Sequence, residues 1–266
     1  MLPRERLHAT VAGAAPVAAA IATVGAELCH VEPGRVTARL LAPPASGVRG
    51  PGAVLVLADY AVTMSVFSTL TVDRRLSTLT LQFCELSPPV GAGTEVLATA
   101  NAVTVGADAV VSSVEFVRSD GVPLARAIGR CALIAPTPGT ALQVATGGEP
   151  TGFADLAVTT APDGLSTQGI AASAFANLYG QLHGGVVAAV LADALSGGLD
   201  AVAPRLAGAP TDYDATFLRT VPADGSRFTT RTSPVRVGAR FAVVRTELHD
   251  AAGRLAAVGT ASRWRG

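Results

Sequence analysis

Hydrophobic and polar residues follow the same order twice along the chain. Each half contains one run that is apolar all around, over residues 53–67 and 186–202. A helix with this pattern is expected to be buried on every side. Four strand-like segments follow each run, separated by turn-forming residues. They are LSTLTLQFCEL, TEVLATANAVTV, AVVSSVEFVRS and PLARAIGRCALI in the first half, and YDATFLRTV, RFTTRTSPVRV, RFAVVRTELHD and RLAAVGTASRW in the second.

The two halves also match residue by residue, which predicts an internal duplication. A shift of 134 residues places the tetrapeptide at 56–59 on the tetrapeptide at 190–193, Val-Leu-Ala-Asp in both cases. The same shift places Phe83 on Phe217, and after a two-residue deletion Gly121 falls on Gly253. A long helix followed by an antiparallel meander predicts an α+β fold in each half.

The segment between the halves is rich in Pro, Gly and Thr and predicts a connection rather than packed structure. We therefore expect an N-terminal unit over 1–134, a linker over 135–152 and a C-terminal unit over 153–266. We expect the linker to be a crossover between two paired units, not a hinge between independent domains.

Composition narrows the partners that the protein could bind. The chain is 49% hydrophobic and 15% charged, with a formal net charge of zero, so it can bury a large core. Nucleic acid binding needs a concentrated basic face, which the sequence does not predict. The cysteines and histidines are scattered, so we expect no metal site. The best membrane-span candidate, 186–203, carries two aspartates, so we expect no membrane partner and a cytoplasmic protein.

Two aspartates stand out because each interrupts an apolar run. Asp59 and Asp193 occupy the same position in the two repeats. Burying a carboxylate costs several kcal/mol unless it is hydrogen-bonded, paired or functional. Each aspartate is therefore either an internal hydrogen-bonding group or a general base or nucleophile.

A second unusual segment directly precedes the apolar run of the second half. It reads Asn177-Leu-Tyr-Gly-Gln-Leu-His183-Gly184-Gly185. Two glycines at the start of a helix let a ligand approach the backbone, where unpaired N–H groups and the positive end of the helix dipole favour negative charge. This pattern predicts an oxyanion site made of backbone N–H groups; a tight turn is the simpler alternative.

His-Gly-Gly at the start of an apolar helix that carries an acidic residue, followed by a strand meander, resembles the hotdog-fold acyl-CoA thioesterases. The resemblance is strongest to the PaaI-like, phenylacetate-pathway branch, and covers most of the chain as two hotdog units. It implies a double hotdog, in which two long central helices are each wrapped by an antiparallel sheet and pair as a pseudo-dimer. It also implies that each site takes its loop from one unit and its acid from the other.

Carried onto this chain, the resemblance implies one complete set of site residues. The loop of the C-terminal half would supply Asn177, His183 and the two glycines Gly184 and Gly185, either of which could donate the N–H. The N-terminal half would supply Asp59 and, eighteen residues later, Ser77 to position water.

The reciprocal site would join Asp193 and Thr211 to the loop of the N-terminal half. In that loop Arg49 replaces the histidine, Pro51 replaces the second glycine, and Pro43 stands where the asparagine is expected. Because proline has no backbone N–H to donate, we expect this site to be degenerate.

The resemblance implies hydrolysis of an acyl-CoA or acyl-carrier-protein thioester. Asp59 would activate a water or attack directly, and no cofactor is required beyond the coenzyme A of the substrate. Two alternatives keep the fold: a hydratase or dehydratase acting on an acyl-thioester, and a non-catalytic acyl-CoA-binding protein. Further assembly into a homo-oligomer is compatible with the sequence.

Overall fold

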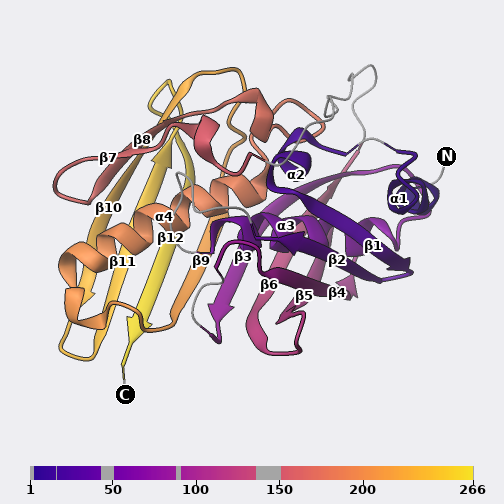
Figure 1. Ribbon diagram of the computed structural model, residues 1–266. Helices are drawn as coiled ribbons and strands as arrows, with labels where there is room; N and C mark the ends of the chain where they lie inside the picture. The colour runs from indigo at the N-terminus through magenta and orange to yellow at the C-terminus, as the bar shows by residue number, and fades with distance from the viewer. Residues whose placement is uncertain (1–2, 16, 43–50, 88–90, 136–150, 266) are drawn as a thin grey trace.

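The computed structural model describes residues 3–15, 17–42, 51–87, 91–135 and 151–265. Their strands form one antiparallel sheet of twelve strands, in the order β1-β2-β4-β5-β6-β3-β9-β12-β11-β10-β8-β7. The sheet curves around two helices, α3 and α4, which lie against each other in its concave face (Figure 1). This is the double-hotdog arrangement expected from the sequence.

The first half of the chain forms one end of the sheet. Its elements are α1 (Pro3–Val11), α2 (Ala19–Val24), β1 (Ala26–Glu32), β2 (Arg35–Leu41), α3 (Gly52–Phe67), β3 (Arg75–Glu85), β4 (Glu95–Val105), β5 (Ala109–Arg118) and β6 (Pro123–Ile134).

The second half repeats this order at the other end of the sheet. Its elements are η1 (Ala154–Leu156), β7 (Thr159–Thr160), β8 (Ser166–Ile170), η2 (Ser173–Phe175), α4 (Gly184–Val202), η3 (Pro204–Leu206), β9 (Thr211–Phe217), β10 (Arg227–Val237), β11 (Phe241–His249) and β12 (Leu255–Trp264).

Each central helix is buried because its residues are apolar on all faces, as the sequence predicts. In α3, residues 54–62 are all buried, and in α4 residues 185–199 are all buried. One face of each helix packs on its own half of the sheet and another on the opposite helix. α4 is long and apolar enough to cross a membrane, but 83% of that stretch is buried inside the protein.

A hairpin that the sequence analysis does not predict precedes the central helix in each half. The hairpin is β1–β2 in the first half and β7–β8 in the second. In both halves its second strand extends the meander, β2 beside β4 and β8 beside β10. In β2 the buried and exposed positions alternate regularly, so the first hairpin has the strand pattern, whereas the second is short, with two residues in β7 and five in β8.

The two halves are joined edge to edge by β3 and β9. Residues 80–84 of β3 pair antiparallel with residues 212–216 of β9. Together with the helix pair, this seam makes the two units one continuous body. The predicted linker falls between β6 and η1; residues 136–150 lie outside the described residues.

The strand pairing corrects the position of the two-residue deletion between the repeats. Leu86 N–H donates to Leu124 O, and Leu218 N–H donates to Ala256 O in the same way. From Thr80 onward, β3 and β9 are thus already related by an offset of 132 residues, so the deletion precedes this part of the strands. The counterpart of Phe83 is therefore Ala215 and not Phe217.

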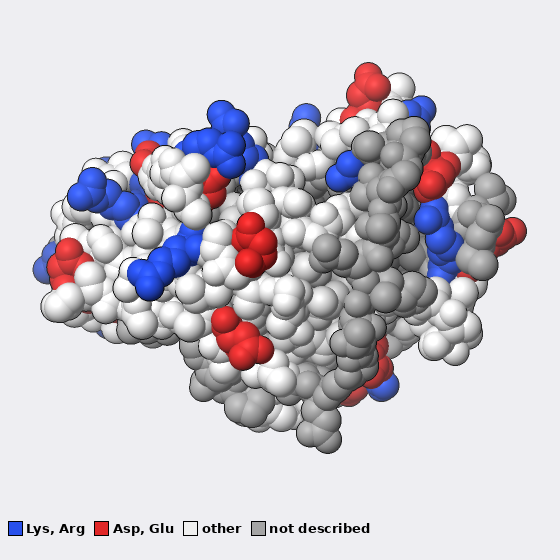
Figure 2. Space-filling model, turned by 90° about the horizontal axis from the view of Figure 1, so that it is seen from above, with Lys and Arg blue, Asp and Glu red and all other residues white. Residues whose placement is uncertain are grey.

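Surface charge is dispersed on the face shown in Figure 2. Arginine and acidic side chains are scattered among uncharged residues there, without a continuous basic area.

Candidate functional site

The site lies where the N-terminus of α4 touches the middle of α3. A Cβ atom added to Gly185 would lie 2.5 Å from Val56 Cα and 2.9 Å from Leu55 O. A Cβ atom added to Gly184 would lie 2.7 Å from Asp59 Oδ2. Two glycines at this position therefore allow backbone-to-backbone contact between the helices, and they bring the loop of one half against the carboxylate of the other.

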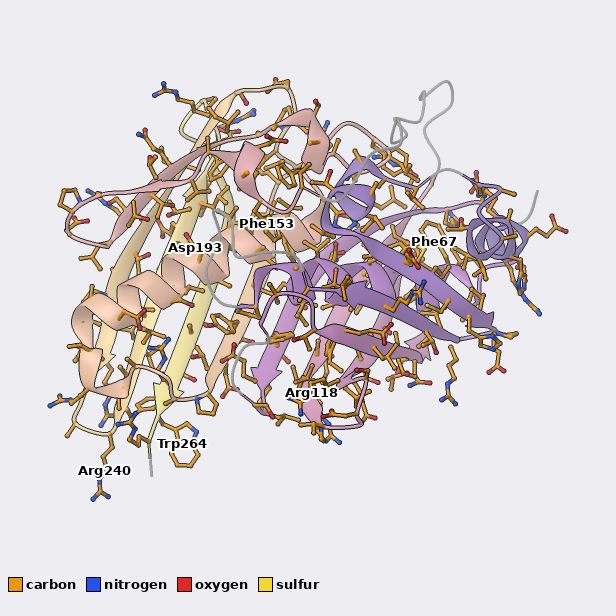
Figure 3. All side chains as sticks on the ribbon, in the orientation of Figure 1. Phe67, Arg118, Phe153, Asp193, Arg240 and Trp264 are labelled. Atoms are coloured by element: carbon orange, nitrogen blue, oxygen red, sulfur yellow. The ribbon has the colours of Figure 1, made fainter. Side chains whose placement is uncertain are left out.

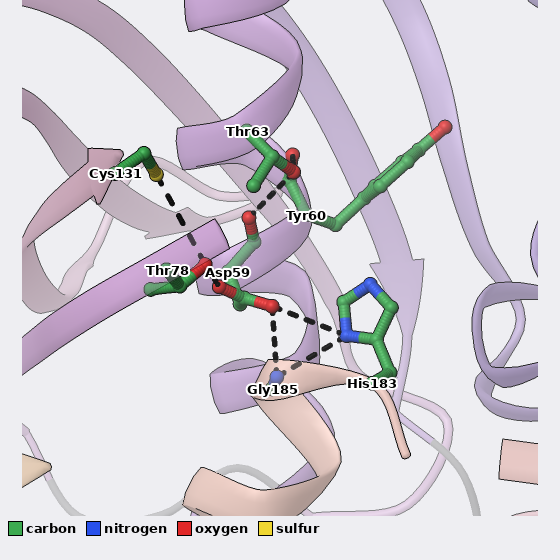
Figure 4. Close-up of polar contacts among 7 residues, drawn as sticks. All are labelled: Asp59, Tyr60, Thr63, Thr78, Cys131, His183 and Gly185. Atoms are coloured by element: carbon green, nitrogen blue, oxygen red, sulfur yellow. Dashed lines mark hydrogen bonds and ion pairs between the residues drawn. The ribbon is translucent and has the colours of Figure 1, made fainter. Parts of the chain in front are cut away.

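Asp59 is the centre of the polar contacts shown in Figure 4. Its side chain is 4% exposed, and both carboxylate oxygens accept a hydrogen bond. Gly185 N–H donates to Oδ2 at 2.8 Å, across the two halves, and the Thr78 hydroxyl donates to Oδ1 at 2.6 Å. These bonds compensate for part of the desolvation of a buried carboxylate.

His183 is the N-cap residue of α4 and contacts Asp59 directly. Its Nδ1 lies 3.2 Å from Asp59 Oδ2 and 3.1 Å from the N atom of Gly185. Burial lowers the pKa of His183, and the nearby Asp59 carboxylate opposes that shift. The imidazole is therefore neutral at pH 7 and can serve as a hydrogen-bonding group beside the carboxylate.

Thr78, and not Ser77, is the hydroxyl residue that contacts Asp59. Neighbouring residues of a strand point to opposite faces of the sheet, so only one of the two can face α3. A β-bulge between Thr78 and Thr80 adds one residue to β3. The bulge follows Thr78, so it does not explain why Thr78 lies nineteen and not the expected eighteen residues after Asp59; that one-residue difference arises between α3 and Thr78. Nothing in the sequence marks that difference.

Cys131 lies beside Thr78 on β6 and was not singled out from the sequence. Its Sγ atom is 4.0 Å from Thr78 Oγ1, and its side chain is fully buried. Burial and, to a smaller extent, the Asp59 carboxylate raise the pKa of the Cys131 thiol to about 12. It is therefore a neutral thiol that fills the space behind Thr78.

Asn177 shapes the loop rather than contacting Asp59. Its Oδ1 accepts hydrogen bonds from the N–H groups of Tyr179 and Gln181, at 2.8 and 3.2 Å. The Tyr179 ring in turn lies under the Arg75 guanidinium, 4.1 Å from the ring centroid. Since Arg75 begins β3, this cation–π contact ties the loop of the second half to the first half.

The reciprocal site is only partly described. Asp193 lies on α4 (Figure 3) and is buried, at 5% exposure. Arg49 and Pro43 lie outside the described residues. Pro51, at the start of α3, stands where the other loop has Gly185.

Thr211 has different contacts from its counterpart, Thr78. Thr78 pairs with Cys131, whereas Thr211 pairs with Arg263, which replaces Cys131 at the same place in the meander. Arg263 Nε donates to the Thr211 hydroxyl at 3.0 Å, and Arg263 Nη1 donates to Asp200 at 2.6 Å. The Thr211 hydroxyl is therefore bound by an arginine and not by an aspartate.

Glu85 extends this polar chain across the seam. Its Oε2 accepts the Thr211 N–H at 2.9 Å, while its Oε1 is buried with no hydrogen-bond partner among the described residues. Burial raises the pKa of the Glu85 carboxyl to about 7, although the Thr211 N–H and the Arg263 charge oppose the shift.

The described residues offer no group of three or more His, Cys, Asp or Glu side chains that could hold a metal ion. A cavity of about 520 Å³ lies elsewhere, against β7, β8 and β10, and its lining shares no residue with the Asp59 site.

Residues 172–264 match the family model described as the acyl-CoA thioesterase N-terminal domain. The match begins before the Asn177 loop and ends at the last residue of β12, so it spans most of the second half. No curated protein matches the sequence.

Solved structures similar to the whole chain include two double-length proteins. One is a provisionally assigned thioesterase II of Thermobifida fusca YX, at 13% identity and a TM-score of 0.61, covering 94% of this chain and 98% of that one. Another is the acyl-CoA thioesterase II TesB2 of Mycobacterium marinum, at 17% identity and a TM-score of 0.53, covering 90% and 94%.

A shorter similar structure matches half of the chain. It is a provisionally assigned thioesterase, related to phenylacetic acid degradation, of Ralstonia eutropha JMP134. The identity is 26% and the TM-score 0.43, with 48% of this chain and 98% of that one covered.

Proposed function

We propose that this double-hotdog chain, whose second half matches the acyl-CoA thioesterase family model, hydrolyses acyl-CoA thioesters at one site, shared between its halves. The observation that carries the proposal is the contact of Asp59 with the Gly185 N–H, at 2.8 Å. It joins an acid from one half to the His-Gly-Gly turn of the other.

Gly184 is the better donor for the developing oxyanion. The Gly185 N–H is already used to hold Asp59, whereas the Gly184 N–H has no acceptor among the described hydrogen bonds. It is the first N–H of α4, which has no partner inside the helix and sits at the positive end of the dipole. A thioester carbonyl placed there would lie beside the Asp59 carboxylate.

Asp59 carries the chemical step in the proposed mechanism. It takes a proton from water while the water oxygen bonds to the carbonyl carbon, and the C–S bond then breaks with the proton passing to the coenzyme A sulfur. In the alternative, an Asp59 oxygen bonds to the carbonyl carbon and the C–S bond breaks, which releases the coenzyme A thiolate. Water then opens the anhydride to give the free acid and the restored Asp59 carboxylate, and a proton of that water neutralises the thiolate. In both, Thr78 and Gly185 orient the carboxylate, and neutral His183 orients the thioester or the leaving sulfur.

The test is release of free thiol from a panel of acyl-CoAs of increasing chain length. Wild-type protein should release coenzyme A far faster than the uncatalysed rate for at least one chain length. The same panel attached to a carrier protein would tell which thioester is preferred. Wild-type protein without activity on any thioester would contradict the proposal.

A hydratase is the second candidate, because His183 and Asp59 are in direct contact and could act together as an acid and a base. Addition of water to an enoyl-CoA is followed by loss of its conjugated absorbance. Hydration of the enoyl-CoA without release of thiol would identify the protein as a hydratase. Binding of acyl-CoA with neither reaction would identify a non-catalytic binding protein.

A further inference from the structure

Three segments meet beyond the C-terminal end of α4 and form a protruding end of the second half. They are η3 with the residues after it, the turn between β10 and β11, and the end of β12. Arg205 Nη2 donates to Gly238 O at 3.0 Å, and Arg265 N–H donates to Arg240 O at 3.0 Å. We call this region, residues 203–209, 233–241 and 264–265, the arginine tip.

The arginine tip exposes large apolar side chains. Val235 and Trp264 are 62% and 61% exposed, and Val237 and Phe241 are 45% and 37% exposed. Phe241 and Trp264 are direct cross-strand partners, so their rings lie on the same face of the sheet. Trp264 projects from the lower end of the molecule in Figure 3, near Arg240. Trp264 is therefore not part of the buried core.

All charged side chains in the segments of the arginine tip are positive. Its segments contain four exposed arginines and no acidic residue: Arg205, Arg236, Arg240 and Arg265. The whole chain has a formal net charge of zero, so this concentration is local.

The internal repeat shows that the fold does not require these residues. The first half makes the same turn, with Gly106 N–H bonded to Ala109 O as Gly238 N–H is to Phe241 O. It has the same bulge, where Val103 is 63% exposed. The first half lacks the arginines and aromatic residues, however. At the offset of 132 residues, its counterparts of Arg236, Arg240, Phe241 and Trp264 are Thr104, Asp108, Ala109 and Ala132.

We propose that the arginine tip is a docking surface for an anionic lipid membrane. Tryptophan and phenylalanine at a protruding end suit the interface between headgroups and acyl chains, and arginines around them suit anionic headgroups. The proposal does not depend on the proposed function. It departs from the expectation of no membrane partner, which considered only segments that could span a bilayer.

Two other occupants fit the arginine tip less well. Pairing with a second copy through the same tip would bring arginines against arginines, with no acidic residue in these segments to offset them. An acidic protein would match the charge, but the tip is the narrow end of a few strands rather than a broad face of the size that stable complexes bury.

Sedimentation with lipid vesicles tests the proposal. Wild-type protein should bind vesicles of equal parts phosphatidylglycerol and phosphatidylcholine, bind poorly to phosphatidylcholine alone, and be released by salt. The double variant R236A/R240A should bind the anionic vesicles about thirtyfold more weakly. Trp264→Ser should also weaken binding, even at low salt.

The matched control is Val103→Ser at the corresponding end of the first half, which should bind as wild type does. All variants should keep wild-type activity on a soluble short-chain acyl-CoA, because α4 separates the tip from Gly184 by about 28 Å. Failure of wild-type protein to bind anionic vesicles, or undiminished binding by R236A/R240A, would overturn the proposal. A change of oligomeric state in Trp264→Ser without vesicle binding would assign the tip to protein–protein contact instead.

Discussion

The two halves share one fold, but the equivalent threonines, Thr78 and Thr211, make different hydrogen bonds. In the first half, Thr78 donates its hydroxyl to Asp59, with a neutral Cys131 behind it. In the second half, Thr211 receives a hydrogen bond from Arg263, which stands in place of that cysteine. The Thr78 hydroxyl thus donates to an aspartate, whereas the Thr211 hydroxyl accepts from an arginine and donates to Ala209 O at 3.4 Å. Duplicated positions therefore do not imply duplicated chemistry.

The sharpest test of this comparison is to neutralise each aspartate in turn. Asp59→Asn should lower kcat for acyl-CoA hydrolysis by about 10²–10⁴-fold, because an amide can neither accept a proton from water nor attack a thioester. Asp193→Asn should change kcat only a few-fold. Thiol release measures both, and melting curves check that both variants fold. An inactive Asp193→Asn with an active Asp59→Asn would reverse the assignment of the two sites.

The two threonines can be compared in the same way, with a smaller expected effect. Thr78→Val keeps the shape but removes a hydrogen bond to a charged group, so kcat should fall about tenfold to a hundredfold. Thr211→Val should leave kcat near the wild-type value.

Ser77→Ala is the matched control, since Ser77 makes no described hydrogen bond to Asp59. If Ser77→Ala lowers kcat as much as Thr78→Val does, Ser77 takes part in positioning water, as the family resemblance implies.

The helix contact can be tested through stability. Gly185→Ala places a methyl group 2.5 Å from Val56 Cα, so the helices must separate, at a cost of about 1–3 kcal/mol in the free energy of unfolding. Gly91→Ala is the control, because a methyl group there meets no atom within 4 Å. Denaturant titrations compare the two. Equal stability of both variants would mean that the helices are not in backbone contact.

The smallest expected effect concerns Glu85 at the seam. Its folded-state pKa is raised to about 7, above the ordinary value of 4.5. The folded state therefore holds a proton that the unfolded state releases between these values, and stability falls as the pH rises from about 4.5 to 7. Glu85→Gln keeps an acceptor for the Thr211 N–H without the charge. It should raise the melting temperature at pH 8 more than at pH 5.

The test is the difference between the melting-temperature shift at pH 8 and the shift at pH 5. A Glu85→Gln variant that shifts the melting temperature equally at both pH values would show that Glu85 does not titrate on folding in this range.

Most of the fold could be predicted from the sequence, and so could the contact of Asp59 with the Gly184–Gly185 turn. Asp59 was visible because a carboxylate interrupts an apolar run, and Gly184 and Gly185 because a glycine pair opens a helix. Thr78 was not predicted, because the segment between α3 and β3 is one residue longer than the expected spacing and nothing in the sequence marks that difference. Arg263 was missed because its importance lies in strand pairing, and pairing brings together residues far apart in the sequence.

The two paired halves belong to one chain, with β3 and β9 hydrogen-bonded across the seam between them. In a symmetric dimer of identical chains, replacing the cysteine behind the threonine by arginine would damage both centres at once. Here the same replacement is confined to one of them. Fusion thus removes the constraint of symmetry, so one centre can be lost and its residues can evolve toward another purpose while turnover continues at the other.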